Sequence, residues 1–507
     1  MPFDIVSLLP DALVRHLPAL VVVFPMLLAP ITAVVPSWRV AWAIVLAGIV
    51  GSVICAFALV QVVYADGTLS YALGGWAPPL GIEFVVDKMN APILLLVAII
   101  GTLATIYALP TMVKEIPEEK RALFMSAFIL CMAGLLGVAV TGDAFNLFVF
   151  LEISSISTYV LVAIGGMNDR RAFTAAFNYL IMGSIGATFY VIGVGFLYAA
   201  TGTLNMTDLA ARIPEVADST TIHAGFAFIV VGLGLKLAMF PLHQWLPNAY
   251  AYSPNFVTVF LAATATKVAF YALVRLLFSV FSPALEFQQM TFTWVLAPLA
   301  AIAAITCSFQ AVFQTDIKRM LAYSSVAQVG YMLLGLALAT ELGLSAGLFH
   351  LINHAMMKGA LFMAVGGVAL SLGSSQLRDF AGVARKAPWT MTAMAIAALS
   401  LVGVPLTAGF LSKVALFKAA LVEGWWWVVV VLAMSSVLAV LYVGRILEST
   451  FFKTPGPTQM NVREAPIMLL LPLWVLALAN IYFGIDASFI TNLTDGAASI
   501  AFPGVRP

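Results

Sequence analysis

The feature that most constrains this chain is a series of long apolar stretches that continues from one end of the sequence to the other. A helix needs about 20 apolar residues to cross a bilayer core about 30 Å thick. A transmembrane β-barrel would instead show segments of about ten residues with alternating polarity, which this chain lacks. We therefore predict an all-α polytopic membrane protein with about 14 spans, at approximately 17–35, 40–64, 89–110, 122–141, 144–164, 172–201, 223–240, 254–281, 293–313, 320–340, 343–371, 389–412, 425–444 and 466–488.

The composition excludes several other classes of protein. Of the 507 residues, 62% are hydrophobic and only 9% are charged, which lies far from the balance of a soluble protein. The net charge of +1 gives no reason to expect a nucleic-acid partner. Cys55, Cys131 and Cys307 are isolated within apolar spans, so we expect neither a disulfide framework nor a cysteine metal site. We predict no cofactor and no metal.

The distribution of the basic residues predicts the orientation. If both termini lie outside, 14 Lys and Arg, Lys318 among them, fall in inside loops and only six, Arg275 among them, fall in outside loops or helix ends. The positive-inside rule favours this arrangement. Because the N-terminus lacks a basic segment before its apolar stretch, we expect no cleaved signal peptide. Four lysines belong to neither group: Lys236, Lys267, Lys358 and Lys413.

The spans predict one membrane domain, 1–507, with internal repeats. Span 7 carries Pro241 and Pro247 and span 12 carries Pro405, and proline interrupts the helical hydrogen-bond ladder. Paired broken helices in two halves often mark transporter sites. Spans 4–8 (122–281) and spans 9–13 (293–444) are therefore interpreted as two repeats, inverted because five is odd, between N-terminal helices at 1–121 and a last helix at 466–488.

Ionisable side chains fall near the middle of several spans. Glu152 lies in span 5, Lys236 in span 7 beside its break, Lys267 in span 8 and Lys358 in span 11. Each such group costs roughly 2.5–3.5 kcal/mol on insertion scales, so something must compensate it, and central positions make snorkelling to the interface a poor alternative. We expect a row of polar groups parallel to the membrane plane.

Span 11 carries a file of three such groups. His350, His354 and Lys358 recur every four residues and therefore lie on one helical face, about 6 Å apart along the axis. Histidine titrates near neutrality, and burial moves lysine toward the same range. The file is suited to proton exchange, and Glu152, if close to Lys236, would control the charge of that amine.

Each of these groups also has a structural alternative. Glu152 and Lys236 could be an ion pair that only joins helices. The spacing of His350 and His354 could bind zinc, although no third ligand accompanies them, and His350 could simply pack.

Two further candidates lie beside the breaks. His243 could cap backbone freed at the first break, and Lys413, which follows the second, could simply bind nearby carbonyls.

At these residues the chain resembles the superfamily of antiporter-like subunits found in complex I and in Mrp-type cation/proton antiporters, over nearly all spans. The resemblance implies a fifth-helix glutamate, a broken-helix lysine, a connecting lysine, a central file and a terminal exit residue for protons. The matching motifs are FLEISS with Glu152, LGLKLAMFP with Lys236, ATKVAFYAL with Lys267, FHLINHAMMKGALF with His350, His354 and Lys358, and GFLSK with Lys413.

Within that superfamily, four features favour the D-type component of Mrp antiporters. The segment LGGWAPPLGIEFVVD at 73–87 looks like the one that precedes the third helix in that component. Lys413 stands where one complex I subunit carries glutamate, and no long lateral helix follows span 14. Asn248 stands where complex I members usually have aspartate. The alternative is a proton-pumping subunit of complex I or of a membrane-bound hydrogenase.

The resemblance implies a subunit of a multisubunit secondary transporter, not an enzyme, in a bacterial plasma membrane. Sibling membrane subunits would complete the exchange of a monovalent cation, Na⁺ first among them, for protons. Protons would enter near span 7, pass from Lys236 through Lys267 to the span 11 file, and leave through Lys413. Two other classes stay open: a single-chain solute carrier, for which we identify no substrate pocket, and a passive scaffold.

Overall fold

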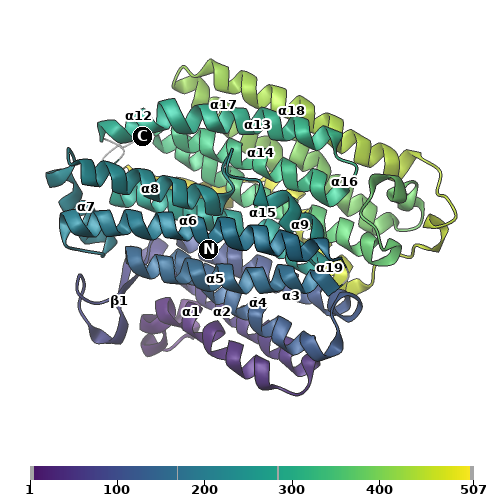
Figure 1. The fold of residues 1–507 in the computed structure, drawn as a ribbon, viewed down its shortest axis with the longest axis horizontal. Helices are drawn as coiled ribbons and strands as arrows, with labels where there is room; N and C mark the ends of the chain where they lie inside the picture. Colours follow the sequence, from purple (N-terminus) through teal and green to yellow (C-terminus); the bar gives the residue numbers. More distant parts are fainter. Residues whose placement is uncertain (1–4, 168, 283–284, 503–507) are drawn as a thin grey trace.

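The computed structural model describes residues 5–167, 169–282 and 285–502 and shows a bundle of helices with one small β-hairpin (Figure 1). Thirteen helical segments are long and apolar enough to cross a membrane, and the shorter apolar helix Pro388–Val402 forms part of the remaining predicted span. The prediction of an all-α polytopic membrane protein is confirmed.

The elements follow the predicted spans closely. The helices and strands are α1 (Asp11–Val34), α2 (Trp38–Asp66), β1 (Leu69–Ala72), β2 (Glu83–Val86), α3 (Ala91–Glu115), α4 (Arg121–Val140), α5 (Ala144–Ile164), α6 (Arg171–Thr201), α7 (Met206–Arg212), α8 (Thr220–Leu237), α9 (Trp245–Tyr252), α10 (Asn255–Ala263), α11 (Ala265–Arg275), α12 (Glu286–Thr291), α13 (Ala297–Phe313), α14 (Ile317–Ala337), α15 (Glu341–Leu372), α16 (Pro388–Val402), α17 (Ala408–Val422), α18 (Trp426–Leu447), α19 (Ile467–Ile485) and α20 (Ser488–Ala501).

Both predicted breaks are present. Span 7 divides into α8 and α9, and span 12 divides into α16 and α17. Each first half ends on a residue in the left-handed conformation, Ala238 (φ 60°) or Gly403 (φ 92°), which ends a helix because the next peptide turns away from its axis. A third interruption was not predicted: Thr264 separates α10 from α11 without any proline or glycine to signal it.

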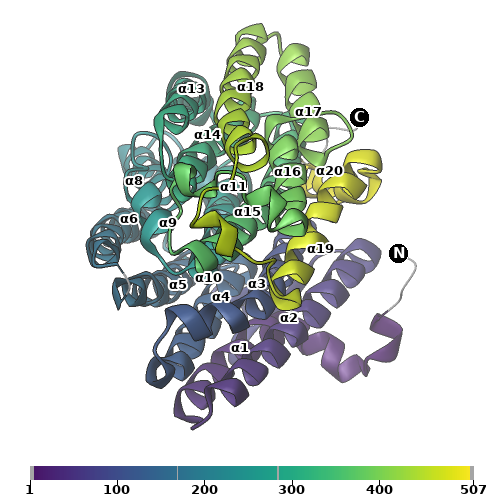
Figure 2. The same ribbon diagram turned by 90° about the vertical axis from the view of Figure 1, so that its right-hand side faces the viewer.

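The helices run between two faces of the molecule, which we name by their contents. The hairpin face carries β1, β2 and α7, and the basic face carries the loops after α3, α5, α15 and α18 (left and right in Figure 1). Figure 2 looks along the helices and shows α11 and α15 in the middle of the bundle, with α1 and α2 at one edge and α17 and α18 at the other. Lys267 on α11 and the group of His350, His354 and Lys358 on α15 therefore lie on central helices.

Close approach of α6 and α8 fixes the half-helix that carries Lys236. A Cβ added at Gly232 of α8 would lie 2.6 Å from the backbone nitrogen of Tyr190 on α6, so no larger residue fits there. Small residues at such positions let membrane helices pack backbone to backbone.

The two predicted repeats share a detailed backbone pattern. Asp143 caps α5 by accepting from the N–H of Asn146 at 2.7 Å, and Asp316 caps α14 by accepting from the N–H of Arg319 at 2.9 Å. Each cap also forms a bridge with the segment after the following helix, Asp143 with Asn205 and Asp316 with Gln376. The division of the chain into repeats at 122–281 and 293–444 stays a prediction. The matching caps and bridges, which lie on opposite faces of the molecule, support it.

Two basic residues counted as loop charges are in fact buried. Arg275 donates to Asp87 at 2.7 and 2.8 Å and to the Tyr271 hydroxyl at 3.0 Å, which fastens β2 to α11. Burial raises the pKa of Asp87, but the Arg275 charge outweighs this effect and holds the pKa below its usual value. Lys318, at the start of α14, donates to the carbonyl of Ser253 at 3.0 Å. The positions of Arg275 and Lys318 near span ends did not predict that either residue would be buried against a partner.

The region after the last predicted span also differs from expectation. The predicted spans end at residue 488, but a further helix, α20 (Ser488–Ala501), follows α19 and packs against α15. Its inner face carries Leu493, Ala497 and Ala501, at the spacing of an amphipathic helix. This helix covers the hairpin-face end of α15.

Candidate functional site

The first part of the site is an ion pair at the first broken span. Lys236 lies one residue before the end of α8, where free carbonyls make the helix terminus favourable for a cation. Its Nζ lies 3.1 Å from Oε1 of Glu152 on α5 and donates to the Ser155 hydroxyl at 2.6 Å. The structure thus places Glu152 beside Lys236, which is the condition that the sequence analysis set for control of this amine.

The environment of this pair is asymmetric. The Lys236 side chain is 6% exposed, whereas that of Glu152 is 24% exposed. Ser155 was missed by the sequence reasoning, although its position three residues after Glu152 puts both on one face of α5. The indole of Trp245, at the start of α9, donates to the Leu235 carbonyl at 3.0 Å and so ties the two halves of the broken span together.

Lys267 lies deeper in the bundle. It is fully buried on α11, three residues after the interruption at Thr264, and its ammonium donates to the freed carbonyl of Ala262 and to the Thr266 hydroxyl at 3.3 Å. The unpredicted break therefore supplies the acceptor that a buried lysine needs. On the preceding α9, Tyr250 donates its hydroxyl to the Leu261 carbonyl at 3.1 Å, next to the acceptor of Lys267.

The predicted file on α15 is present and buried. His350 contacts Gln328 Oε1 through Nε2 at 2.8 Å and the Ser412 hydroxyl through Nδ1 at 3.0 Å, so both ring nitrogens are engaged in polar contacts. The ring of His354 is nearly parallel to that of His350, with centroids 6.2 Å apart. Neither nitrogen of His354 has a hydrogen-bond partner within the described part of the chain.

Lys358 completes the file. Its ammonium donates to the Leu321 carbonyl at 2.8 Å and to the Ser324 hydroxyl, both on α14. Lys267 interacts electrostatically with His350, His354 and Lys358, so the connecting lysine and the α15 file form one cluster. Among the residues that the structure describes, no carboxylate takes part in the hydrogen bonds of this cluster.

Lys413 lies at the second broken span. From α17 its ammonium reaches back to the end of α16, donating to the carbonyls of Leu401 at 3.0 Å and Val402 at 2.7 Å, and to the Ser436 hydroxyl at 3.1 Å. It also lies over the Tyr331 ring, 5.4 Å from the centroid, and His350 stacks on the same ring. Tyr331 thus connects the file to the second break.

His243 is the one candidate outside this series. It lies in the turn between α8 and α9, with Nε2 3.8 Å from the thiol of Cys307 on α13 and its ring stacked on Phe240. The structure thus brings together Glu152 with Lys236, and Lys267 with His350, His354, Lys358 and Lys413. From the second half of span 7, α9, Trp245 and Tyr250 donate to the carbonyls of Leu235 and Leu261, next to each of the two groups.

The chain matches a family model described as NADH:quinone oxidoreductase/Mrp antiporter, transmembrane, over residues 141–439. It is 40% identical to the NADH-quinone oxidoreductase subunit N of Desulforudis audaxviator, over 96% of this chain and 99% of that protein. It is 30% identical to the D component of the Na⁺/H⁺ antiporter of Bacillus subtilis, over 87% of each.

Solved structures show the same fold. A subunit of the Mrp complex from Dietzia sp. matches with a TM-score of 0.89 at 26% identity, over 97% of this chain and 98% of that chain. A subunit of the membrane-bound sulfane sulfur reductase, an archaeal respiratory membrane complex, matches with a TM-score of 0.88 at 31% identity, over 96% and 98%. These relatives are subunits of multisubunit membrane complexes.

Proposed function

Because the chain belongs to the NADH:quinone oxidoreductase/Mrp antiporter transmembrane family, we propose that it is the proton-translocating subunit of a multisubunit Na⁺/H⁺ antiporter. It works in a bacterial plasma membrane with both termini and the hairpin face outside, and with the basic face inside, as the distribution of Lys and Arg favours. Sibling membrane subunits complete the exchanger.

The observation that supports this function most strongly is the pair of Lys236 and Glu152 at a helix break. A lysine without a partner would lose its proton on burial, and a carboxylate at 3.1 Å favours the charged form. When Glu152, the more exposed of the two, moves away or is neutralised, the amine releases its proton. The pair therefore acts as a switch on the charge of Lys236.

The rest of the row carries the proton onward. Lys267 receives it from the Lys236 side, and His354 and Lys358 pass it along α15. His350 connects the file to Lys413, which releases the proton toward the hairpin face. His243 supports the first break. The neighbours of these groups are hydroxyls and carbonyls, which accept hydrogen bonds without fixing the charge.

A second candidate function is a proton-pumping subunit of a redox-driven complex. The 40% identity to a protein named NADH-quinone oxidoreductase subunit N favours it, as does the likeness to a respiratory membrane complex. The buried row would do the same work there, but the driving energy would come from electron transfer in partner subunits. The two candidates differ in whether Na⁺ moves.

The deciding experiment uses everted vesicles that contain the chain together with its neighbouring subunits. Sodium-dependent dissipation of a pH gradient is compared between wild type and assembled Glu152→Ala and Lys236→Ala variants, with the exposed Glu423→Ala as a matched control. We expect exchange to be lost in the first two and retained in the control.

Each other outcome rejects a specific claim. A wild-type complex that pumps protons on a redox substrate and shows no sodium response supports the second candidate. Undiminished exchange in both assembled variants would mean that Glu152 and Lys236 form only a structural ion pair, as in a passive scaffold. Activity of the chain purified alone contradicts the requirement for sibling subunits.

A further inference from the structure

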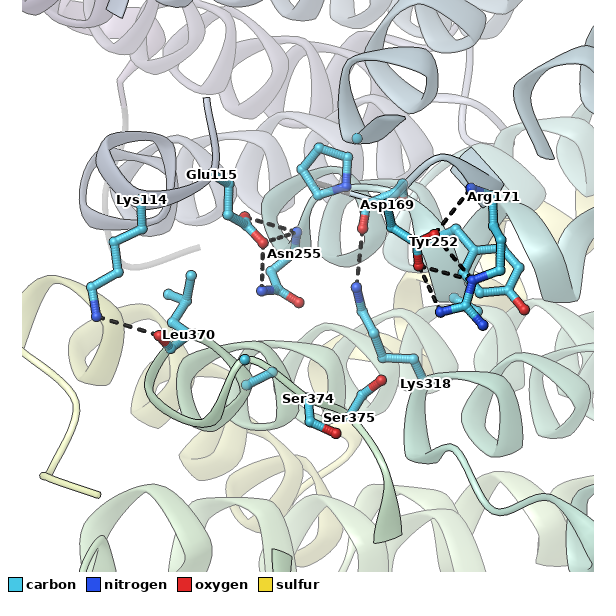
Figure 3. A pocket seen from close by; sticks show the side chains of 16 residues that line it. Lys114, Glu115, Asp169, Arg171, Tyr252, Asn255, Lys318, Leu370, Ser374 and Ser375 are labelled. Carbon is cyan, nitrogen blue, oxygen red and sulfur yellow. Dashed lines mark hydrogen bonds and ion pairs between the residues drawn. The ribbon is translucent and has the colours of Figure 1, made fainter. Parts of the chain in front are cut away.

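A polar cavity of about 510 Å³ lies on the basic face, away from the row described above. It is bounded by the ends of α3, α9 and α15, the starts of α10 and α14, and the connection between α5 and α6 (Figure 3). A second cavity of about 330 Å³ shares the wall at Arg171, Tyr252 and Ser374. Five segments that are distant in sequence thus form one polar depression.

Three side chains form its floor, and we name them the floor triad: the half-buried Glu115 and the buried Asn255 and Lys318. The Glu115 carboxylate accepts from the backbone N–H of Asn255 at 3.0 and 3.2 Å and from its side-chain amide at 2.7 Å. Lys318 donates to the Ser253 carbonyl at 3.0 Å and interacts electrostatically with Glu115. Figure 3 shows Glu115 and Asn255 facing Lys318 across the cavity.

The amide oxygen of Asn255 sets this floor apart from ordinary packing. Asn255 is 6% exposed, and its Oδ1 is buried without a hydrogen-bond partner among the described residues, while its nitrogen is held by Glu115. A buried acceptor without a donor destabilises a fold, because the oxygen has lost its hydrogen bonds to water. In Figure 3 this oxygen turns away from Glu115, on the side of Asn255 that faces Lys318.

The floor triad connects to the α15 file through one helical face. A Cβ at Gly366 would lie 2.5 Å from the Tyr107 hydroxyl and 2.9 Å from Asn255 Cβ, so the absence of a side chain lets both approach α15. Gly366 follows Lys358 by two steps of four residues, about 12 Å along the same face. Phe362 occupies the step between them and packs edge-to-face on Tyr250, with centroids 5.9 Å apart.

We propose that the floor triad is the mouth of a proton-uptake route from the basic face to Lys358 and Lys267. A hydronium ion in the cavity gives its proton to the Glu115 carboxylate, which Asn255 holds in place. The proton then passes along the Gly366 face of α15 to the Lys358 amine when the Tyr250–Phe362 contact opens. This inference rests on the proposed function and adds an uptake site from which protons join the row at Lys358 and Lys267, while the charge of the Glu152–Lys236 pair controls transfer along the row.

The charged groups around the mouth suit this task. Lys114 donates to the Leu370 carbonyl at 3.4 Å, and Asp169 is held by Arg171 at 2.7 Å, so both are engaged at the rim. The floor triad carries one negative and one positive charge, which leaves no excess charge to trap an ion permanently. Protons therefore exchange there without a deep electrostatic well.

The test blocks the cavity from one side. Ala251, on its wall, is replaced by cysteine in a chain whose Cys55, Cys131 and Cys307 are changed to alanine, and the assembled complex is placed in vesicles. A charged, membrane-impermeant thiol reagent is added to the basic face. We expect proton movement, read with a pH-sensitive dye, to fall at least fivefold relative to the same vesicles before treatment.

Two controls give the result its meaning. The reagent added to the hairpin face should change nothing, and Thr458→Cys, exposed on the basic-face loop before α19, should be labelled without a change in proton movement. Complete labelling of Ala251→Cys with undiminished proton movement overturns the inference. Equal inhibition in Thr458→Cys also overturns it, because inhibition would not depend on the cavity.

A second variant tests the floor directly. Asn255→Leu removes the unpartnered oxygen and should slow proton movement about tenfold, whereas Gln314→Leu in the adjoining cavity should leave the rate within twofold. Because proton movement is read whichever reaction drives it, a redox-driven complex rejects the sodium claim but not this route. A wild-type complex that moves no protons in either mode overturns both proposals together.

Discussion

The two broken spans solve the same problem with different chemistry. In both, the first half-helix ends in a left-handed residue, and a lysine ammonium lies near that end, where the helix dipole favours a cation. At the first break that group is Lys236, two residues before Ala238. At the second, the equivalent residue is Leu401, two residues before Gly403, and Lys413 reaches back from α17 to its carbonyl. A cation thus lies at both helix ends, but Lys236 comes from the helix before its break and Lys413 from the helix after its break.

The difference lies in the partner. Glu152 stands nine residues after the cap Asp143, and nine residues after the cap Asp316 the second repeat has Ser325. The first ammonium is therefore paired with a carboxylate, whereas Lys413 is held by carbonyls and a hydroxyl. A charged partner can switch the charge of an amine, and neutral acceptors can only solvate it. Under the proposed function, this difference assigns control of the proton to the first predicted repeat and conduction to the second.

The largest expected effect comes from substituting the residue in which the two breaks differ most, Glu152. Breaking a buried ion pair costs about 3–5 kcal/mol, and about 1.4 kcal/mol corresponds to tenfold. We expect Glu152→Gln to lower the proton flux of the assembled complex in proteoliposomes by about a hundredfold or more. Ser325→Ala should leave it within about twofold, because the one hydrogen bond that Ser325 makes among the described residues goes to the Leu321 carbonyl of its own helix. Similar losses in both would show that the repeats do not divide the work.

The next effect separates charge from proton transfer. An arginine keeps a positive charge at these sites but does not release its proton, since its pKa exceeds about 12. Lys236→Arg and Lys413→Arg should each assemble normally and transport at least about tenfold more slowly. Exposed Lys418→Arg is the matched control, and assembly is followed by size-exclusion chromatography. Full activity of either buried variant would mean that its lysine serves only as a fixed charge.

A smaller effect concerns the two helix ends. At Gly403 a Cβ would meet Lys413 Cδ at 2.9 Å, and a left-handed conformation costs an L-residue about 1–2 kcal/mol. Gly403→Ala should lower the melting temperature in detergent and slow proton flux several-fold. Ala238→Gly, the reciprocal change, should stabilise the protein by about 1 kcal/mol and leave the flux unchanged. Melting curves that respond in the same direction would contradict the proposed equivalence of the two ends.

The smallest effect compares the two helix caps outside the spans. Burial raises the pKa of Asp143, so its neutral form is favoured in the fold and ionisation costs stability as the pH rises through that pKa. Asp143→Asn, which can still cap α5, should therefore raise the melting temperature slightly near neutral pH and lose this advantage in acid. Asp316→Asn should instead cost about 1 kcal/mol, since Asp316 also accepts from Gln376 at 3.2 Å.

The sequence predicted the parts of the site that depend on depth and spacing. Central charges in apolar spans and proline at two breaks indicated Glu152 and Lys236 as members of a buried row. The four-residue spacing placed His350, His354 and Lys358 on one helical face. The interruption at Thr264 carries no residue that signals it. Burial of Lys318 and Arg275 depends on partners from distant segments, and the basic-face cavity is assembled from five of them. Such features are set by tertiary packing, which periodicity does not report.

The separation of Glu152 and Lys236 along the chain has a consequence for biogenesis. They lie 84 residues apart, so at a synthesis rate of about 5–20 residues per second the glutamate waits roughly 4–17 s for its lysine. During that interval span 5 enters the bilayer with an unpaired acid, which must bind a proton or stay within the insertion machinery. Once span 7 is complete, Lys236 can pair with Glu152, and span 5 can leave the insertion machinery. Assembly of this helix pair is thus ordered by translation itself, and slowing the ribosome between the two spans lengthens the vulnerable stage.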